Sequence, residues 1–311
     1  AVTGVSGSGK TSLVIECLVP ALQAVIQGTK LPEHVDSIEA KGIQSVKVID
    51  SKPIGANVRS TVATYDGVFD DLRKLFARTA DAKAKGLTAG DFSYNTGKLR
   101  CPVCDGTGII TMDVQFLPDV DTICPSCGGS RYGKDAYDIL WKSKEKDSVA
   151  VSLPGLLKLT VEEAAGILHE ETKIAKQLKI LQDLGVCYLT LGEATPALSG
   201  GEAQRLKLAY EMETPQQGSV FVFDEPTIGL HPQDVKKLVL IFDHLIQLGA
   251  TVIVIEHDLE LVTNCDYIID MGPWGGTEGG RVVVEGTPEA VAATSESITG
   301  RYLKQELAED K

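Results

Sequence analysis

The sequence is poor in aromatic residues, in positive charge and in long hydrophobic runs. Aromatic residues make up 5% of its 311 residues, and 30 lysines and arginines stand against 43 acidic residues, which gives a formal net charge of −13. This balance argues against a generally basic nucleic-acid-binding surface, so any contact with a polyanion must be local. A run of about 18 apolar residues is also lacking, which excludes a typical membrane-spanning helix. We see no internal repeat and no low-complexity tail.

The chain further lacks the pattern of a secretory leader, because residues 1–3 lead directly into a glycine-rich loop with no charged and apolar regions before it. We therefore expect a cytoplasmic protein with no membrane partner. Its seven cysteines are then expected to be reduced or bound to metal rather than paired in disulfides. A core strand is usually longer than the segment before this loop, so we expect the chain to be part of a longer protein.

The glycine-rich loop GVSGSGKT at 4–11 fits the pattern G-x-x-x-x-G-K-[ST] of a P-loop. In a P-loop, backbone N–H groups and the lysine surround nucleotide phosphates, and the Ser or Thr hydroxyl, here that of Thr11, reaches Mg²⁺. An amphipathic spacing over 11–27 predicts a helix whose N-terminus would face the phosphates. The alternative interpretation is a glycine-rich turn before an ordinary helix.

Two apolar segments end in residues suited to ATP hydrolysis. The segment 220–223 is followed by Asp224, which would hold Mg²⁺ through water, and by Glu225, which would polarise the attacking water. The segment 251–255 is followed by Glu256 and His257, and the histidine would contact the γ-phosphate. Ligands bind at the carboxyl ends of parallel strands, so we expect His257 to lie at the same sheet edge as Glu225. The alternatives are a solvated strand end and an incidental surface histidine.

Strand-like and helix-like patterns alternate along much of the chain, which favours an α/β fold with a parallel sheet flanked by helices. Strands are expected at 45–50, 219–223, 251–255, 267–270 and 281–285. Helices are expected at 11–27, 66–84, 160–184, 201–212 and 232–248. The segment 86–133, rich in glycine, proline and cysteine, has few periodic apolar residues, so burial alone is not expected to hold it and we expect a metal to do so.

The order of the motifs resembles a known family. LSGGEAQ at 198–204 is the signature of ATP-binding-cassette (ABC) ATPases, and GVSGSGKTS, LSGGEAQR, FVFDEPTIGLHP and VIVIEHD in this order resemble the C-terminal half of UvrA proteins. UvrA proteins are the DNA-damage-recognition ATPases of bacterial nucleotide excision repair. The similarity extends to the segment from PIG to ATYDGVFDDLRKLFA at 53–77. Transporter cassettes usually have Ser-Ala-Leu-Asp where this chain has GLH at 229–231, which argues against a transport-type ABC ATPase.

The resemblance implies an ABC-type P-loop core with an inserted helical signature subdomain that carries a zinc module. We expect the first part of the core at 1–50, the inserted subdomain at 51–184 and the second part of the core at 185–311. The implied cofactors are ATP, Mg²⁺ and Zn²⁺, with Mg²⁺ at Thr11 and Asp224 and hydrolysis supported by Glu225 and His257. The residues implied to bind nucleotide are Ser6, Gly7, Ser8, Gly9, Lys10, Thr11, Ser12 and Asp224, together with Ser199, Gly200, Gly201 and Glu202 of the signature.

In cassette ATPases, the signature of one half closes over the P-loop of another half. The chain would therefore supply parts of two composite sites, and the ATPase would be complete only in the full-length dimer. One residue departs from the family pattern: Ser51 stands where UvrA-type sequences usually have a glutamine that contacts Mg²⁺ and the attacking water. This departure puts normal coupling between the ATP state and the inserted subdomain in doubt, or else marks a divergent branch of the family.

Four cysteines form the pattern C-x2-C-x19-C-x2-C, with Cys101, Cys104, Cys124 and Cys127 as the candidate ligands. This spacing, with glycines beside both pairs, is typical of a structural zinc site. Four thiolates leave no open coordination position, so a catalytic zinc is not expected. The alternatives are a redox pair or free buried thiols.

Four cations flank the cysteine pairs and are candidate contacts to DNA phosphates: Lys98, Arg100, Arg131 and Lys134. Arg59 and the hydroxyl of Ser60, in the loop that follows PIG, are further candidates. The neighbouring Asp105, Asp113, Asp119, Asp121 and Asp135 nearly balance them, so an ordinary charged surface is the alternative. Phe92, Tyr94 and Tyr132 are expected to pack rather than to stack on bases.

The function that the resemblance implies is ATP-driven recognition of damaged double-stranded DNA, with a second UvrA subunit and a UvrB-type helicase as partners. The alternative that Ser51 suggests is a UvrA-like paralogue for tolerance of DNA-intercalating compounds.

Overall fold

The computed structural model describes residues 1–112, 120–144, 149–212 and 216–309. The chain divides into two compact units, a core unit of residues 1–52 and 211–311 and an inserted unit of residues 53–210. The second division therefore falls after Tyr210, whereas the sequence division falls after residue 184. Backbone hydrogen bonds from α2 (Val62–Tyr65) explain the difference, since Val62 N donates to Glu193 O and Ala63 N to Leu191 O. Asp113 and Asp119 lie outside the described residues.

The core unit is built on a six-stranded sheet in the order β10-β9-β1-β8-β7-β2. The strands are β1 (Val2–Gly4), β2 (Ser45–Ile49), β7 (Ser219–Asp224), β8 (Thr251–Ile255), β9 (Ile268–Gly272) and β10 (Arg281–Gly286). All neighbouring pairs are parallel except β9 and β10, which are antiparallel. The expected α/β fold with a mainly parallel sheet is confirmed.

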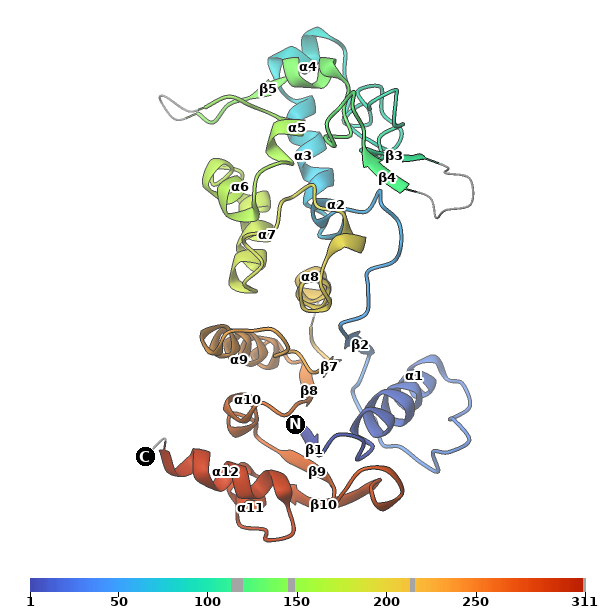
Figure 1. Cartoon of the computed structure of the whole chain (residues 1–311), viewed down its shortest axis with the longest axis vertical. Coiled ribbons are helices and arrows are strands. Elements are labelled where there is room, and N and C mark those ends of the chain that lie inside the picture. The colour runs from blue at the N-terminus through green and yellow to red at the C-terminus, as the bar shows by residue number, and fades with distance from the viewer. Residues whose placement is uncertain (113–119, 145–148, 213–215, 310–311) are drawn as a thin grey trace. The chain divides into compact units, whose positions relative to one another are not determined.

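Both faces of this sheet are buried, as the alternation along β7 shows. Val220 and Val222 join a core cluster that includes Val14 and Leu22 of the first helix. Phe223 points to the other face, where its ring centroid lies 4.5 Å from that of Phe242 in α9 (Pro232–Gln247). Successive side chains of a strand point to opposite faces, so helices must cover both. Figure 1 shows α1 on one side of the sheet and α9 on the other.

The helix after the P-loop has two parts, a π-helical segment Ser12–Leu18 and α1 (Val19–Gln27). Pro20 has no N–H group and cannot donate to the carbonyl four residues earlier, which belongs to Glu16. Nε2 of His34 lies 3.1 Å from that carbonyl oxygen. The remaining helices of the core unit are α10 (Leu259–Thr263), α11 (Pro288–Ala292) and α12 (Ile298–Glu309).

The regular structure of the inserted unit is mainly helical, as expected. Its helices are α2 (Val62–Tyr65), α3 (Val68–Ala77), α4 (Ala80–Ala84), α5 (Leu153–Leu156), α6 (Val161–Ile167), α7 (Thr172–Asp183) and α8 (Gly200–Met212). Two short hairpins accompany them, β3 (Ile109–Met112) with β4 (Val120–Ile123) and β5 (Leu140–Trp141) with β6 (Val151–Ser152). Among the described residues, no helix combines the length and the apolar character needed to cross a membrane.

Two helices that the sequence predicts as continuous are broken. The segment 66–84 divides into α3 and α4, because the Thr79 hydroxyl accepts from Ala82 N and caps a new helix. The segment 160–184 divides into α6 and α7, and the ring Nδ1 of His169 lies 2.8 Å from the Gly166 carbonyl in the break. Thr160 and Glu163 form the expected capping box of α6.

Burial holds more of the segment 86–133 than its composition predicts. Phe92, Tyr94 and Tyr132 are fully buried, and the ring centroids of Tyr94 and Phe69 of α3 lie 4.8 Å apart. The Tyr132 hydroxyl donates to the Phe92 carbonyl oxygen at 2.6 Å. The expectation that these aromatics pack is confirmed, and burial therefore contributes to holding this segment.

Candidate functional site

The P-loop leaves β1 through a turn that has room for glycine alone. Gly4 has φ 131°, and a Cβ atom there would lie 2.0 Å from the Met271 carbonyl oxygen. Lys10 is buried, and its Nζ donates to the carbonyls of Gly4 and Val5 at 2.9 Å each. Burial lowers the pKa of Lys10, while the carboxylates of Glu225, Asp270 and Asp224 oppose this effect. The ammonium group therefore lies at the centre of the loop, within the field of these carboxylates.

A second glycine-rich turn supports the P-loop, and sequence reasoning missed it. Gly276 N donates to Gly7 O at 3.1 Å, and Gly280 N donates to Ser8 O at 2.9 Å. The turn lies between β9 and β10, at the edge of the sheet where β9 pairs with β1. The glycines between the two late strands were a visible signal, but their partners lie about 270 residues earlier in the chain.

Asp224, Glu225 and His257 come together at the carboxyl ends of β7 and β8. Nε2 of His257 lies 3.3 Å from Oε1 of Glu225. Glu225 has a left-handed backbone with φ 47°, and its N–H still donates to Ile255 O at 2.9 Å. Burial raises the pKa of Asp224, and the charges of Glu225 and Asp50 raise it further. This concentration of carboxylates is the environment in which a hard divalent cation binds.

Glu256 positions His257, a role that the sequence did not reveal. This carboxylate is buried and accepts hydrogen bonds from the N–H groups of Thr227, His257 and Asp258. The hydroxyl of Thr227 also donates to it. Because Thr227 follows Glu225 by two residues, Glu256 ties the loop after β7 to the loop that carries the histidine. The signal in the sequence was an acid placed between an apolar strand and a candidate site histidine.

Asp270 in β9 is a second buried organiser near the P-loop. Its carboxylate accepts from the hydroxyls of Thr3, Ser297 and Thr299 at 2.7 Å each. Thr3 directly precedes the P-loop, whereas Ser297 and Thr299 lie at the start of α12. Asp270 therefore joins the strand that leads into the P-loop to the C-terminal helix.

The signature residues lie in the inserted unit at the N-terminus of α8. Ser199 N donates to Oε2 of Glu202 at 2.7 Å, and the Tyr188 hydroxyl donates to Oε1 of Glu202 at 2.8 Å. Burial alone would raise the pKa of Glu202, but the hydrogen bonds from Ser199 and Tyr188 bring it below the ordinary value. Ser199, Gly200 and Gly201 precede or open the first turn and are at least partly accessible. A helix N-terminus of this kind binds anions such as phosphate.

Ser51 lies two residues after the end of β2, at the same sheet edge as Asp224, and is exposed. Its neighbour Lys52 places Nζ 3.5 Å from Oδ2 of Asp50. A serine side chain is shorter than the glutamine expected here by resemblance, so it reaches less far from the strand end.

The four cysteines lie together in the inserted unit. Their sulfur atoms are all within 4.8 Å of one another. The distances between Sγ atoms are 4.0 Å for Cys101 and Cys124 and 3.7 Å for Cys104 and Cys127. Zn–S bonds of about 2.3 Å in a tetrahedron place sulfur atoms about 3.8 Å apart, so the cluster fits this metal without rearrangement.

The thiols of this cluster differ in their acidity. Burial would raise the pKa of Cys101, but the N–H groups of Cys104 and Val103 stabilise its thiolate and bring the pKa to about 7. Burial and the neighbouring sulfurs of Cys104 and Cys124 raise the pKa of Cys127 to about 12. A bound cation is therefore needed for all four sulfurs to be thiolates at neutral pH.

The candidate DNA contacts differ in their access to solvent. Arg131 is 6% exposed, its guanidinium carbon lies 5.1 Å from the Tyr94 ring centroid, and its Nη1 has no hydrogen-bond partner among the described residues. Arg131 is therefore too buried to contact DNA, and its assignment as a candidate DNA contact is wrong. Burial lowers its pKa, and the nearby Cys104 and Cys127 oppose this. Arg131 is a buried positive charge that would balance the negative charge of a zinc tetrathiolate.

The other members of this group are accessible to solvent at least in part. Lys134 is exposed, and Lys98 lies 3.4 Å from Asp91. Arg59 and Arg100 both pair with Asp105. Ser60 is held by its backbone, since its N–H donates to Asn57 O and its carbonyl accepts from Thr195 N.

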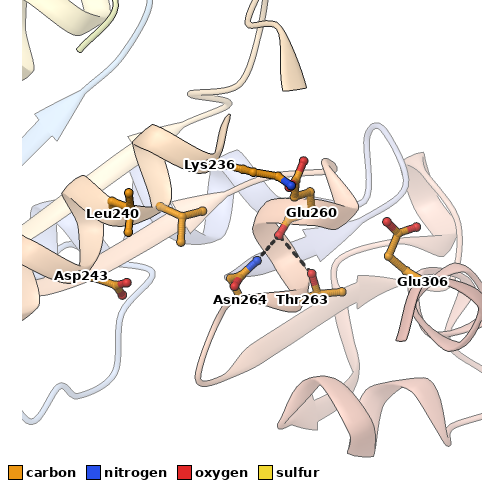
Figure 2. Close-up of a pocket in the computed structure, with 8 residues that line it drawn as sticks. Lys236, Leu240, Asp243, Glu260, Thr263, Asn264 and Glu306 are labelled. Atoms are coloured by element: carbon orange, nitrogen blue, oxygen red, sulfur yellow. Dashed lines mark hydrogen bonds and ion pairs between the residues drawn. The ribbon is translucent and has the colours of Figure 1, made fainter. Parts of the chain in front are cut away.

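A cavity of about 320 Å³ adjoins these motifs in the core unit and is lined in part by Gly4, Val5, Glu256 and His257. A wider cavity of about 600 Å³ lies between α9, α10 and α12 and is lined by other residues, among them Lys236, Asp243 and Glu306. Figure 2 shows Lys236 beside Glu260, with which it pairs at 3.2 Å. Because no motif residue lines the wider cavity, we assign the candidate site to the P-loop edge of the sheet.

The fold and the site together define the class of protein. A mainly parallel sheet, a P-loop after β1, two carboxylates after β7 and a histidine after β8 form an ABC-type P-loop NTPase core. The inserted unit carries the signature and a four-cysteine cluster suited to zinc.

Comparison with known proteins gives the family. No family model matches the chain. It is 45% identical over 313 residues to UvrABC system protein A of Staphylococcus aureus strain COL, which covers 100% of this chain and 32% of that protein. It is 46% identical over 311 residues to UvrABC system protein A of Clostridium acetobutylicum, with 98% and 32% covered. The crystal structure of UvrA2 from Deinococcus radiodurans matches with a TM-score of 0.85 and 42% identity, over 98% of this chain and 36% of that one.

The chain belongs to the UvrA family and matches its C-terminal half. It spans about a third of the length of the curated relatives that it matches, 32% in each case.

Proposed function

We propose that the chain is the nucleotide-binding, zinc-bearing part of a UvrA-type excision-repair protein that hydrolyses ATP. The observation that carries this proposal is the contact between Nε2 of His257 and Oε1 of Glu225, 3.3 Å apart at the P-loop edge of the sheet. Glu225 would accept a hydrogen bond from the attacking water and polarise it, and His257 would orient that water against the γ-phosphate. Glu256 holds the histidine loop in the position that this geometry requires.

The phosphates would bind to the P-loop, where the N–H groups of residues 6–12 and the ammonium group of Lys10 supply positive potential. Thr11 and Asp224 would hold Mg²⁺, which neutralises phosphate charge. Lys10 now donates to two P-loop carbonyls and would turn its donors toward phosphate oxygens. Burial lowers the pKa of Lys10, and the negative charges of Glu225, Asp270 and Asp224 oppose this lowering.

The signature residues 199–202 would contact a second nucleotide through the N-terminus of α8. As in cassette ATPases, that nucleotide would be held by the P-loop of another half, so full activity would require a homodimer of the full-length protein. The accessible first turn of α8 and its Ser199–Glu202 hydrogen bond support this role.

The inserted unit would be the part that meets damaged double-stranded DNA. Chemically diverse lesions share no pattern of base-edge hydrogen bonds, so phosphate contacts and DNA deformability are the suitable means of recognition. The accessible Arg59, Arg100, Lys98 and Lys134 around the cysteine module support phosphate contact. We further propose that the DNA is passed to a UvrB-type helicase partner, and that the protein acts in the cytoplasm, where bacterial DNA lies.

DNA binding by the full-length, zinc-loaded protein tests this proposal. We expect salt-sensitive binding to a damaged duplex that changes with the ATP state, measured by fluorescence anisotropy between low and moderate salt. Zinc-loaded full-length protein with no DNA affinity at low salt would contradict the proposal.

A second candidate is a UvrA-like paralogue that gives tolerance of DNA-intercalating compounds. The observation that favours it is the short, exposed Ser51 at the sheet edge that carries Asp224. Deletion of the gene separates the two. Broad ultraviolet sensitivity supports the repair function, whereas sensitivity to intercalators with normal ultraviolet survival supports the paralogue.

A further inference from the structure

Two arginines from distant parts of the inserted unit converge on one carboxylate beside the cysteine cluster. Nη2 of Arg59 lies 3.4 Å from Oδ2 of Asp105, and Nη2 of Arg100 lies 3.0 Å from Oδ1 of the same residue. Arg59 belongs to the segment before α2, whereas Arg100 and Asp105 flank the first cysteine pair. Two guanidinium groups thus hold the two oxygens of one anion, which is how arginines bind a phosphate.

Each arginine is also held by a partner that does not depend on the Asp105 side chain. Nη1 of Arg59 donates to the backbone carbonyl of Asp105 at 2.8 Å, and Nη1 of Arg100 donates to the carbonyl of Asn95 at 3.0 Å. The Tyr94 hydroxyl donates to the Arg59 carbonyl at 3.0 Å and fixes its backbone. The two guanidinium groups would therefore keep their places if the carboxylate turned away.

The Asp105 carboxylate is free to turn away. Its side chain is 60% exposed, and its carboxylate pairs with the two arginines. Asp91, which pairs with Lys98, behaves differently. Its carboxylate is largely buried and accepts from both the N–H and the hydroxyl of Thr88, so that pair is part of the fold. Asp105 alone of these two acids makes a contact that a ligand can replace.

We propose that Arg59 and Arg100 form a binding site for one phosphate of the DNA backbone, and that Asp105 is a displaceable counter-ion that occupies the site without DNA. This inference rests on the proposed DNA-binding function. Incoming phosphate replaces the carboxylate on guanidinium groups that are already positioned, and Asp105 rotates into solvent. The carboxylate therefore weakens non-specific binding, because every phosphate at this site must compete with it.

The test uses Asp105→Asn in the full, zinc-loaded chain, with Asp135→Asn as the matched control. Asp135 is an exposed carboxylate of the same unit, so both variants remove one negative charge. Inorganic phosphate is titrated while the side-chain Nε–H resonances of Arg59 and Arg100 are followed by NMR, which separates this site from the P-loop. Exposed ion pairs are weak, so we expect Asp105→Asn to bind phosphate about two- to fivefold more tightly.

The same variants are then titrated with duplex DNA over a range of salt concentrations. We expect the same gain for Asp105→Asn, and for Arg100→Ala a fall of about 0.9 in the slope of log K against log salt, the value for one lost phosphate contact. If Asp105→Asn binds phosphate more tightly but the protein has no affinity for DNA, the anion site is supported and the proposed DNA-binding function is contradicted. If Asp105→Asn leaves phosphate affinity unchanged, or if Asp135→Asn raises it equally, Asp105 is not a displaceable counter-ion. This conclusion holds whatever the result of the DNA titration.

Discussion

Removal of zinc is expected to unfold the cysteine module while the core unit stays folded. The four sulfur atoms already lie within 4.8 Å of one another, so the metal binds without rearrangement and its binding energy stabilises this conformation directly. Without the metal, the module keeps the β3–β4 hairpin and the loops that carry the thiols. A two-stranded hairpin of this size is marginal in water. The aromatic cluster around Tyr94 packs against α3 and is expected to persist.

The magnitude follows from the two energies involved. Structural zinc contributes about 10–16 kcal/mol in small four-ligand sites, whereas a whole domain is stable by about 5–15 kcal/mol. The free energy lost with the metal is therefore larger than the stability that the hairpin alone provides. The affinity must also rise with pH, because the ligands bind as thiolates. Cys127, with a pKa of about 12, releases its proton when zinc binds at neutral pH. Cys101, with a pKa of about 7, is protonated below that pH and then also releases a proton when zinc binds.

The assay combines chelator competition between pH 6 and 8 with hydrogen exchange of the metal-free protein. As the pH is lowered, we expect the apparent zinc affinity to fall at least about tenfold per pH unit, because at least one proton is exchanged for the metal. The fall should be steeper below pH 7, where Cys101 also exchanges a proton for the metal. Exchange should rise across residues 101–112 and 120–127 and stay low in β7 and β8. Cys104→Ser should lose zinc, and Cys187→Ser, outside the cluster, should keep it. Unchanged exchange after complete chelation would refute the reasoning.

Two further predictions concern the surroundings of the P-loop. Asp270→Ala leaves three hydroxyls without their acceptor, at about 1–3 kcal/mol for each group that stays unpaired. We expect a loss of at least about 3 kcal/mol in denaturant unfolding, against little change for the exposed Asp266→Ala. Gly4→Ala places a Cβ atom 2.0 Å from the Met271 carbonyl, so the loop must shift and calorimetry should show weakened ADP–Mg²⁺ binding. Gly166→Ala, in open space within α6, should leave that binding unchanged, and equal losses would contradict the steric argument.

The sequence predicts most of the core unit because its signals are local. The segment 251–255 is an apolar run, and it forms β8 with the predicted bounds. The segment 219–223 extends by one residue, so that Asp224 ends β7. The four cysteines carry their own spacing rule, and they lie together as expected. In each case the residues that decide the structure are neighbours in the sequence or follow a fixed pattern.

The remaining features depend on contacts between distant residues. Arg131 flanks a cysteine pair like any surface cation, and its burial depends on Tyr94, which lies 37 residues earlier. The partner of Asp270 in β1 is separated from it by 267 residues. The sequence does not predict the break after Ala77, because the helical spacing of apolar residues continues across it. The hydrogen bond that the Thr79 hydroxyl accepts from Ala82 N starts a new helix there. Such side-chain contacts have no periodic signature.

The central claim is that Glu225 and His257 act on a nucleotide held by the P-loop, in a site that a second subunit completes. ATP turnover and ATP binding by full-length wild-type protein and its Glu225→Gln variant test it most directly. We expect ATP binding within about twofold of wild type, a fall in turnover of at least about 100-fold, and weak or absent turnover by the isolated chain. Turnover by Glu225→Gln at the wild-type rate, or robust turnover by the monomeric chain, would contradict it.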